Sequence, residues 1–309
     1  MVQQLLFLLF FNAVQPPHAA LAQNFPSEVV VGPIEEYREE YGKDGPSLDM
    51  RNAPQKKGDS IAPVISAASV YALDISSGTP LFVRDIFTRR PIASIEKLVT
   101  AMVILDHHKL DEKVIVSKTA ASQEGSRMWL VAGEEMTVEN LLKGMLINSG
   151  NDAAVTLAEY DASTESAFVD KMNEKVLSLK LYNTHFSNAK GFYDPDNYSA
   201  AFDTMVFARA ALEYPALRKI VMIKKSEVSS ADGKLTHKLE STNELLENPY
   251  WDVVGLKTGR TPAAGESFVS LLKGPNEQEI LTVMLDSPDR FKETKILLDW
   301  ILRNFEFPF

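Results

Sequence analysis

Residues 94–107 read SIEKLVTAMVILDH, a stretch in which Leu98, Met102 and Leu105 recur at helical spacing. These side chains fall on one face, so the stretch predicts an amphipathic helix that packs against a core. Runs typical of strands come before it and again near the end of the chain, and further helical patterns lie between them. The order of these segments around the helix predicts the fold.

Strand-like runs stand on both sides of the helical part. Residues 67–74 and 81–83 enclose a Ser-Ser-Gly turn and predict a hairpin. Later strands are predicted at 253–258, 267–272 and 280–285. Further helices are predicted at 137–148, 151–161, 165–179, 199–214 and 289–305. This order indicates an α/β fold in which a sheet takes strands from both ends of the chain and a helical region is inserted between them, with any cleft between the two a natural site.

Composition excludes several classes of protein. With 45% apolar and 24% charged residues, the 309-residue chain is not wholly disordered, collagen-like or a multi-span membrane protein. Its net charge of -10 and its lack of a basic run argue against nucleic acid as a partner. The chain contains no cysteine, so a thiolate nucleophile, a disulfide and a Cys-ligated metal are excluded together.

The N-terminus predicts export. Residues 1–22 combine an apolar run with an Ala-Leu-Ala cleavage signature, although Lys and Arg are missing from the start. The run is too short to span a membrane easily as a helix, which needs about 20 residues. Residues 23–62 are polar, acidic and rich in Pro, and they predict a poorly ordered lead-in to a domain at 63–309. We expect the protein to be released after export or held by an uncleaved N-terminus.

The first chemical motif is Ser94-Ile95-Glu96-Lys97, at the predicted start of the long helix. Residues three apart share a helix face, so the Lys97 amine can reach the Ser94 hydroxyl. Lysine can act as a base toward this hydroxyl only when it is neutral, and burial or a nearby cation favours that form. The commoner meaning of the pattern is an N-cap serine followed by a solvated lysine.

Two other motifs come later in the chain. Ser149-Gly150-Asn151 lies between two predicted helices, where a hydroxyl and an amide could relay a proton and hold a substrate amide. Lys257-Thr258-Gly259 ends a β-type run, where Gly allows a close backbone approach and Lys and Thr can bind a carboxylate. Each alone is more simply explained by a helix cap or an exposed strand end.

Together, the three motifs make coincidence a minor explanation, because each lies in the local structure that its role needs. They resemble the set found in penicillin-binding proteins and class A β-lactamases, with Gly150 in place of Asp. The chain is most similar to the low-molecular-weight penicillin-binding proteins, which are serine-type D-alanyl-D-alanine carboxypeptidases of the bacterial envelope. The likeness runs from about Ser66 to Phe305 and includes 125–128, 149–154, 183–186 and 297–300. It implies a β-lactamase/transpeptidase-like sandwich with an antiparallel sheet and an inserted helical subdomain.

The resemblance also implies the catalytic roles. Ser94 would attack the carbonyl of the penultimate D-Ala to give an acyl-enzyme, and Lys97 would be the base for this step. Ser149 would pass a proton to the leaving amine. Lys257 would hold the terminal carboxylate and help to keep Lys97 neutral. Water would then release the shortened peptide, with no metal or cofactor required.

Further residues would bind the substrate by the same resemblance. Asn151 would orient the acyl-side amide and Lys97, while Thr258 and Gly259 complete the third motif. The oxyanion would lie between the backbone N–H groups of Ser94 and Arg260. Arg290 would assist carboxylate binding, or would simply be a surface arginine near a helix N-terminus. The implied partners are a peptidoglycan stem peptide ending in D-Ala-D-Ala and, as covalent inhibitors, β-lactam antibiotics.

Some positions depart from the family pattern. Thr242 stands where relatives often have Arg, and Arg260 stands where many have Tyr or His, so the substrate preference stays open. Glu96 places a carboxyl next to Lys97 in sequence, but neighbours on a helix point apart, and we expect it to have little effect. The alternatives are a D,D-endopeptidase, a β-lactamase of the same fold, or a non-catalytic peptidoglycan-binding homologue.

Overall fold

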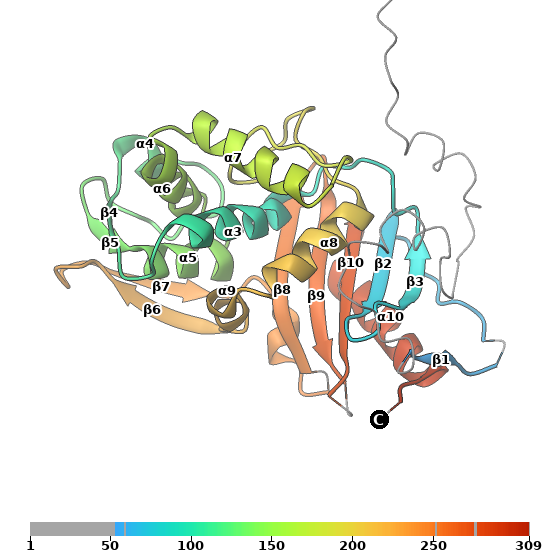
Figure 1. Ribbon diagram of the computed structural model, residues 1–309. Helices are drawn as coiled ribbons and strands as arrows, with labels where there is room; N and C mark the ends of the chain where they lie inside the picture. Colours follow the sequence, from blue (N-terminus) through green and yellow to red (C-terminus); the bar gives the residue numbers. More distant parts are fainter. Residues whose placement is uncertain (1–52, 59, 251, 275–276, 309) are drawn as a thin grey trace, which may run out of the picture.

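The computed structural model describes residues 53–58, 60–250, 252–274 and 277–308. A sheet and a helical region lie side by side, with the helices α3 to α7 grouped at one end of the molecule (Figure 1). The helices are α3 (Lys97–His107), α4 (Lys118–Ala121), α5 (Val138–Ile147), α6 (Asn151–Ala162), α7 (Glu165–Ser178), α8 (Ala201–Ala211), α9 (Pro215–Ile220) and α10 (Arg290–Asn304), with short 3-10 turns η2 (Ala93–Glu96) and η3 (Glu244–Glu247).

The main sheet has five antiparallel strands in the order β3-β2-β10-β9-β8. Its strands are β2 (Ser69–Asp74), β3 (Pro80–Arg84), β8 (Asp252–Thr261), β9 (Gly265–Lys273) and β10 (Glu279–Ser287). Strand β2 pairs with β10, so the N-terminal hairpin and the C-terminal strands form one sheet. The predicted sheet built from both ends of the chain is confirmed.

The two faces of the sheet bury different side chains. On β10, Ile280 and Met284 join the cluster that contains the apolar face of α10. Between them, Leu281 and Val283 join the cluster that contains α8 and the helical region. This alternation follows from the two-residue period of a strand, and it makes a sheet covered by helices on both faces (Figure 1).

The predicted long helices are all present, with boundaries that differ by a few residues. The stretch at 199–214 shortens to α8, and Phe305 leaves the last helix to enter a strand. Short elements were not predicted from the sequence, because two to six residues carry little periodicity. They are α4, α9 and η3, the hairpin strands β4 (Lys113–Ile115), β5 (Glu135–Thr137), β6 (Lys225–Ser229) and β7 (Thr236–Glu240), and the strands β1 (Gln55–Lys56) and β11 (Phe305–Glu306).

The expected lead-in, 23–62, requires a correction at its C-terminal end. Strand β1 pairs with β11, and Ile61 accepts a hydrogen bond of 2.8 Å from the indole N–H of Trp300. Residues from Gln55 onward therefore contact α10 and the strand that follows it, instead of only preceding the domain. Their polar composition concealed this, because the pairing uses backbone groups. The expected signal at 1–22 lies outside the described residues, and in the part that is described no helix has the length and apolarity to cross a membrane.

Candidate active site

The first motif places a lysine amine against a serine hydroxyl. Ser94 lies inside the 3-10 turn η2, and α3 begins at Lys97. The Lys97 Nζ atom donates to Ser94 Oγ at 2.8 Å. Ser94 is therefore not the N-cap of a helix with a solvated lysine one turn later, which was the simpler interpretation of the sequence. The preceding residue, Ala93, has a left-handed φ of 49°, a conformation uncommon for a residue with a side chain.

Lys97 has three polar neighbours in a fully buried setting. Its Nζ donates to Ser94 Oγ, to Asn151 Oδ1 at 2.8 Å and to the backbone carbonyl of Lys190. An ammonium satisfies all three as a donor. A neutral amine can donate to Asn151 and Lys190 and still accept the Ser94 proton through its lone pair. The same geometry thus accommodates the base in both protonation states.

The pKa of Lys97 is lowered to about 7, chiefly because burial disfavours the ammonium. The neighbouring Glu96 opposes this shift, and the positive charge of Lys190 adds to it. Glu96 is itself fully buried, and burial raises its carboxyl pKa to about 8. The expectation that Glu96 would have little effect is wrong. Sequence neighbours can still meet electrostatically when no water separates them.

The second and third motifs form a second serine–lysine pair. Ser149 lies between α5 and α6 with a left-handed φ of 63°, and its Oγ accepts from Lys257 Nζ at 3.0 Å. Lys257 also donates to the carbonyl of Thr258 at 2.8 Å. Burial lowers the pKa of Lys257 well below its usual value, and the charges of Lys97 and Arg290 lower it further. Because such repulsion acts both ways, Lys257 also disfavours an ammonium at Lys97.

Strand β8 contacts the Ser94 turn through Gly259. A Cβ at Gly259 would lie 2.6 Å from the Ile92 carbonyl oxygen and 3.2 Å from the Ala93 side chain, so only glycine permits this approach. The contact brings the third motif against the residues that precede Ser94. The backbone of Arg260 follows directly, while its side chain is exposed and lies 3.8 Å from a carboxylate oxygen of Glu266.

Two further residues support the third motif. Arg290, the first residue of α10, donates from Nη1 to the Gly259 carbonyl at 2.8 Å. It is therefore directed toward the site and is not a surface arginine. Thr258 is buried, and its hydroxyl lies 2.5 Å from that of Thr242. Thr242, noted in the sequence as a departure, thus contacts the motif.

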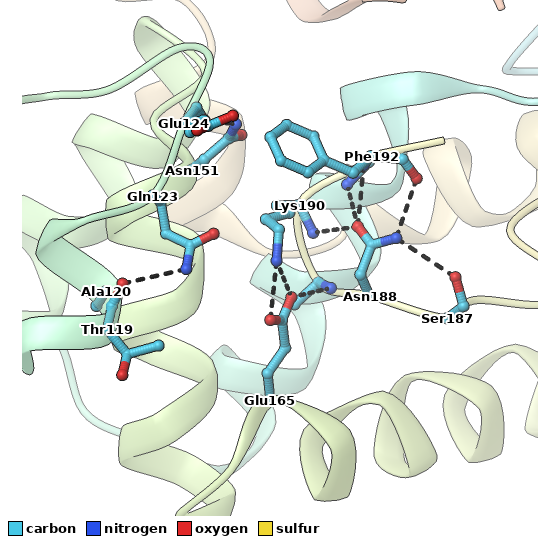
Figure 2. Close-up of polar contacts among 12 residues, drawn as sticks. Thr119, Ala120, Gln123, Glu124, Asn151, Glu165, Ser187, Asn188, Lys190 and Phe192 are labelled. Atoms are coloured by element: carbon cyan, nitrogen blue, oxygen red, sulfur yellow. Dashed lines mark hydrogen bonds and ion pairs between the residues drawn. The ribbon is translucent and has the colours of Figure 1, made fainter. Parts of the chain in front are cut away.

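The segment 188–192 was not predicted as part of the site, although it supplies the Lys190 carbonyl. Asn188 Oδ1 accepts from the backbone N–H groups of Lys190, Gly191 and Phe192 at 2.9 to 3.3 Å. The Lys190 side chain pairs with Glu165 in the first turn of α7, both oxygens being 2.9 Å away (Figure 2). Asn and Gly three residues apart are a turn signature that could have drawn attention to this segment.

Asp152 was also missed, although it orders one wall of the site. Its carboxylate accepts from the backbone N–H groups of Met128 and Leu130, each at 3.0 Å. Asn151 donates from Nδ2 to the Glu124 carbonyl at 2.6 Å, so the same loop also orients the amide that contacts Lys97.

Within the described ranges, no group of three or more His, Asp or Glu side chains is arranged to hold a metal ion.

The chain is similar to known bacterial proteins across most of this architecture. The family model described as D-alanyl-D-alanine carboxypeptidase matches residues 56–288. The D-alanyl-D-alanine carboxypeptidase DacF of Bacillus subtilis is 33% identical over 248 residues, which are 78% of this chain and 63% of that protein. The chain thus spans less than two thirds of that relative.

Other relatives match over more of their length. A D-alanyl-D-alanine carboxypeptidase of Streptomyces sp. strain K15 is 32% identical over 76% of this chain and 87% of its own. The crystal structure of the Streptomyces K15 DD-transpeptidase superposes with a TM-score of 0.73 at 28% identity, covering 79% of this chain and all of that one. The fold predicted from the resemblance is therefore confirmed. Since the family model extends from β1 to the end of β10, the chain belongs to the D-alanyl-D-alanine carboxypeptidase family, peptidase family S11.

Proposed function

We propose that this protein is a serine-type D-alanyl-D-alanine carboxypeptidase that removes the terminal D-Ala from peptidoglycan stem peptides. The observation that carries the proposal is the buried Lys97 amine, 2.8 Å from both Ser94 Oγ and Asn151 Oδ1. A lysine with a pKa near neutrality beside a serine hydroxyl is a general base beside its nucleophile. Family membership supports the same activity.

Acylation begins when the Ser94 oxygen attacks the carbonyl carbon of the penultimate D-Ala. The Ser94 proton passes to Lys97 Nζ as the new C–O bond forms. The oxyanion is held by the backbone N–H groups of Ser94 and Arg260, and the loss of one such donor commonly costs about 2.7 to 4 kcal/mol of barrier. The peptide C–N bond then breaks, and Ser149 passes a proton to the departing amine of D-Ala. The Ser94 proton held by Lys97 replaces it on Ser149, so that Lys97 is a free amine again before deacylation.

Deacylation uses water in place of the amine. Lys97 accepts a proton from the water as its oxygen attacks the ester carbonyl, and the proton returns to Ser94 when the ester bond breaks. The products are the peptide shortened by one residue and the free serine. The left-handed φ at Ser149 and at Ala93 supports this arrangement, because uncommon backbone conformations kept next to reactive groups often serve function.

The substrate carboxylate is recognised by two cations whose side chains form no salt bridge among the described residues. Lys257 is buried, and its hydrogen bonds among the described residues go to a hydroxyl and a carbonyl. Arg290 is mostly buried and forms no salt bridge within the same part of the chain; its Nη1 donates to a carbonyl. Buried cations are stabilised by a paired anion, and a terminal carboxylate would supply it.

The proposal also covers location and domain limits. We infer export to the bacterial cell envelope, with residues 1–22 as the signal and 63–309 as the catalytic domain, together with its β1 addition at Gln55–Lys56. The apolar run and the Ala-Leu-Ala signature support export. Intact-mass measurement of the protein purified from the envelope will give the mature N-terminus.

The activity is tested with two substrates on the purified protein. A fluorescent penicillin is expected to label Ser94, as peptide mapping will show, and a stem pentapeptide is expected to release D-Ala. The variant Ser94→Ala is the control for both reactions. Labelling without D-Ala release would favour a non-catalytic binding protein, and rapid turnover of the penicillin would favour a β-lactamase. Cleavage of cross-linked muropeptides would indicate an endopeptidase.

A further inference from the structure

The carboxyl of Glu96 has no role in the mechanism above, although it is fully buried beside the proposed base. Its Oε2 accepts from Asn197 Nδ2 at 2.7 Å, and its Oε1 has no hydrogen-bond partner in the described part of the chain. The backbone N–H of Gly191 and the charge of Lys97 favour the carboxylate, but burial outweighs them and raises the pKa of Glu96. A buried carboxylate oxygen without a donor is costly, and the cost is smaller when the carboxyl is neutral. The position therefore favours a carboxyl that carries a proton.

Asn197 joins Glu96 to the loop that contacts Lys97. Its Nδ2 donates to the Phe192 carbonyl at 3.1 Å as well as to Glu96, and its Oδ1 accepts from the Ser187 N–H at 3.1 Å. The same loop carries the Lys190 carbonyl that accepts from Lys97 and from the Ser94 hydroxyl, the latter at 3.3 Å. Glu96, through Asn197, and Lys97, directly, are thus both hydrogen-bonded to the loop that carries Lys190 and Phe192.

Charge balance limits the states of this pair. A buried ammonium alone, or a buried carboxylate alone, would be strongly disfavoured, so the pair is most stable with one proton in total. Two arrangements carry one proton: an ammonium at Lys97 with a carboxylate at Glu96, or an amine at Lys97 with a carboxylic acid at Glu96. Burial raises the pKa of Glu96 and lowers that of Lys97, which brings the two arrangements close in free energy.

We propose that Glu96 is a positioning residue that holds the proton given up by Lys97. While the pair still holds one proton, Glu96 can therefore be a carboxylic acid and Lys97 a free amine beside Ser94. The proposal deepens the proposed function, on which it rests. Protons balance, because the amine and the carboxylic acid together hold the one proton that the ammonium held. During acylation the Ser94 proton passes to the Lys97 amine, and the pair then holds two protons, one on Lys97 and one on Glu96.

Other charges face the pair from three directions. Lys190 lowers the pKa of Lys97, while Asp152 at the start of α6 and Glu165 on α7 raise it. Glu165 also raises the pKa of Glu96. The ion pair between Glu165 and Lys190 offsets much of their separate influence (Figure 2). Lys257 on β8 adds positive charge on the side of the substrate. Asp152 and Glu96 are both fully buried, but both oxygens of Asp152 accept backbone N–H groups, whereas Glu96 Oε1 has no hydrogen-bond partner in the described part of the chain.

The test is the pH dependence of penicillin acylation in the full-length protein and in Glu96→Gln. Glutamine keeps an oxygen for Asn197 but cannot exchange a proton. In wild type, the acylation rate is expected to rise with pH in two steps, one for the loss of each proton from the pair. In the variant we expect a single step about one pH unit lower, hence roughly 3- to 10-fold faster acylation near pH 6 and rates within about twofold near pH 9.

Matched controls separate this role from a structural one. Glu165→Gln removes a partly exposed, salt-bridged carboxylate that raises the pKa of both members of the pair, so it is expected to retain two steps, both at lower pH. A uniform fall in rate at every pH in Glu96→Gln, or profiles that coincide with wild type, would overturn the proposal. If penicillin labels neither protein at any pH, the proposed function fails instead.

A second measurement does not require the variant to fold. Infrared pH-difference spectra of wild type, carrying isotope-labelled Glu, are expected to show a protonated carboxyl near pH 7 that is lost above about pH 9. Glu165→Gln should keep this signal, and Glu96→Gln, where it folds, should lack it. A spectrum without a protonated carboxyl at pH 7 would contradict the proposal by itself.

Discussion

The two serine–lysine pairs of the site are chemically alike and are built in opposite ways. Ser94 and Lys97 are 3 residues apart and lie on one continuous turn. Ser149 and Lys257 are 108 residues apart, one between two helices and the other on a strand of the main sheet. The amines are 2.8 and 3.0 Å from their hydroxyls, and both lysines are buried.

The difference in sequence separation indicates which pair depends on the relative position of the sheet and the helices. The local pair is fixed by backbone geometry within η2 and α3, so it persists as long as this helix is formed. The assembled pair exists only while β8 stays against the junction of α5 and α6. We therefore expect the local pair to carry bond formation and the assembled pair to respond to the substrate that enters between sheet and helices.

The largest expected difference between the pairs concerns the nucleophile. Ser94→Ala should abolish covalent labelling by a fluorescent penicillin, because among the described residues Lys97 Nζ contacts no other hydroxyl. Ser149→Ala should still be labelled at Ser94, more slowly, since proton delivery typically contributes about 10²- to 10⁴-fold. Intact-mass time courses on both folded variants measure this. A penicillin adduct on Ser149 in the Ser94→Ala variant would show that both serines can act as nucleophiles, which would contradict this prediction.

The base of the local pair comes next. Lys97→Met should slow acylation by about 10²- to 10⁴-fold. Thermal stability should stay the same or rise, since a buried amine is exchanged for an apolar chain. In wild type the rate should increase with pH through about 7, where Lys97 becomes the free amine. Gel-based labelling over a pH series measures both effects, with Lys118→Met as the surface control. A flat profile from pH 6 to 9 would contradict the assignment.

The amine of the assembled pair should matter less, and chiefly for anionic ligands. Lys257→Met removes a charge-assisted hydrogen bond worth about 1.5 to 3 kcal/mol, so acylation by a penicillin should fall by about 10- to 150-fold. With a penicillin whose carboxylate is esterified, the two proteins should differ little. Equal losses with both compounds would mean that Lys257 acts through Ser149 and not through the carboxylate.

The smallest effect concerns a contact at the edge of the assembled pair. Thr242→Val removes one hydroxyl from the 2.5 Å contact with Thr258. A neutral hydrogen bond contributes about 1 kcal/mol, so the acylation efficiency should fall by about fivefold. Thr242→Ser keeps the hydroxyl and should behave as wild type in the same assay. A loss in Thr242→Ser without one in Thr242→Val would point to the methyl group and not to the hydroxyl.

The same contrast explains how much the sequence could predict. The long helices, the sheet built from both ends and the Ser94–Lys97 pair follow from periodicity and from spacing within one turn. The sequence placed Ser149 and Lys257 in one site through the joint occurrence of three motifs and the family they resemble, and their direct contact is a finding of the structure. Sequence spacing states only which residues share a local face.

The residues that were missed act through tertiary contacts. The Lys190 carbonyl is a backbone group, and no side-chain pattern marks it as an acceptor for Lys97. Glu96 looked inert because neighbouring helix positions diverge, yet burial lets its charge reach Lys97. The contact between Arg290 and the Gly259 carbonyl depends on how α10 meets β8. Each case needs the packed fold before the residue acquires a role.

The pairing of β2 with β10 has a consequence for biosynthesis. Ser69 lies opposite Leu285, so the central strands of the sheet are more than two hundred residues apart in the chain. A ribosome must make almost the whole polypeptide before these strands can meet, and such distant pairing slows folding. The site between the sheet and the helices therefore cannot assemble until the last strands of the chain have been synthesised.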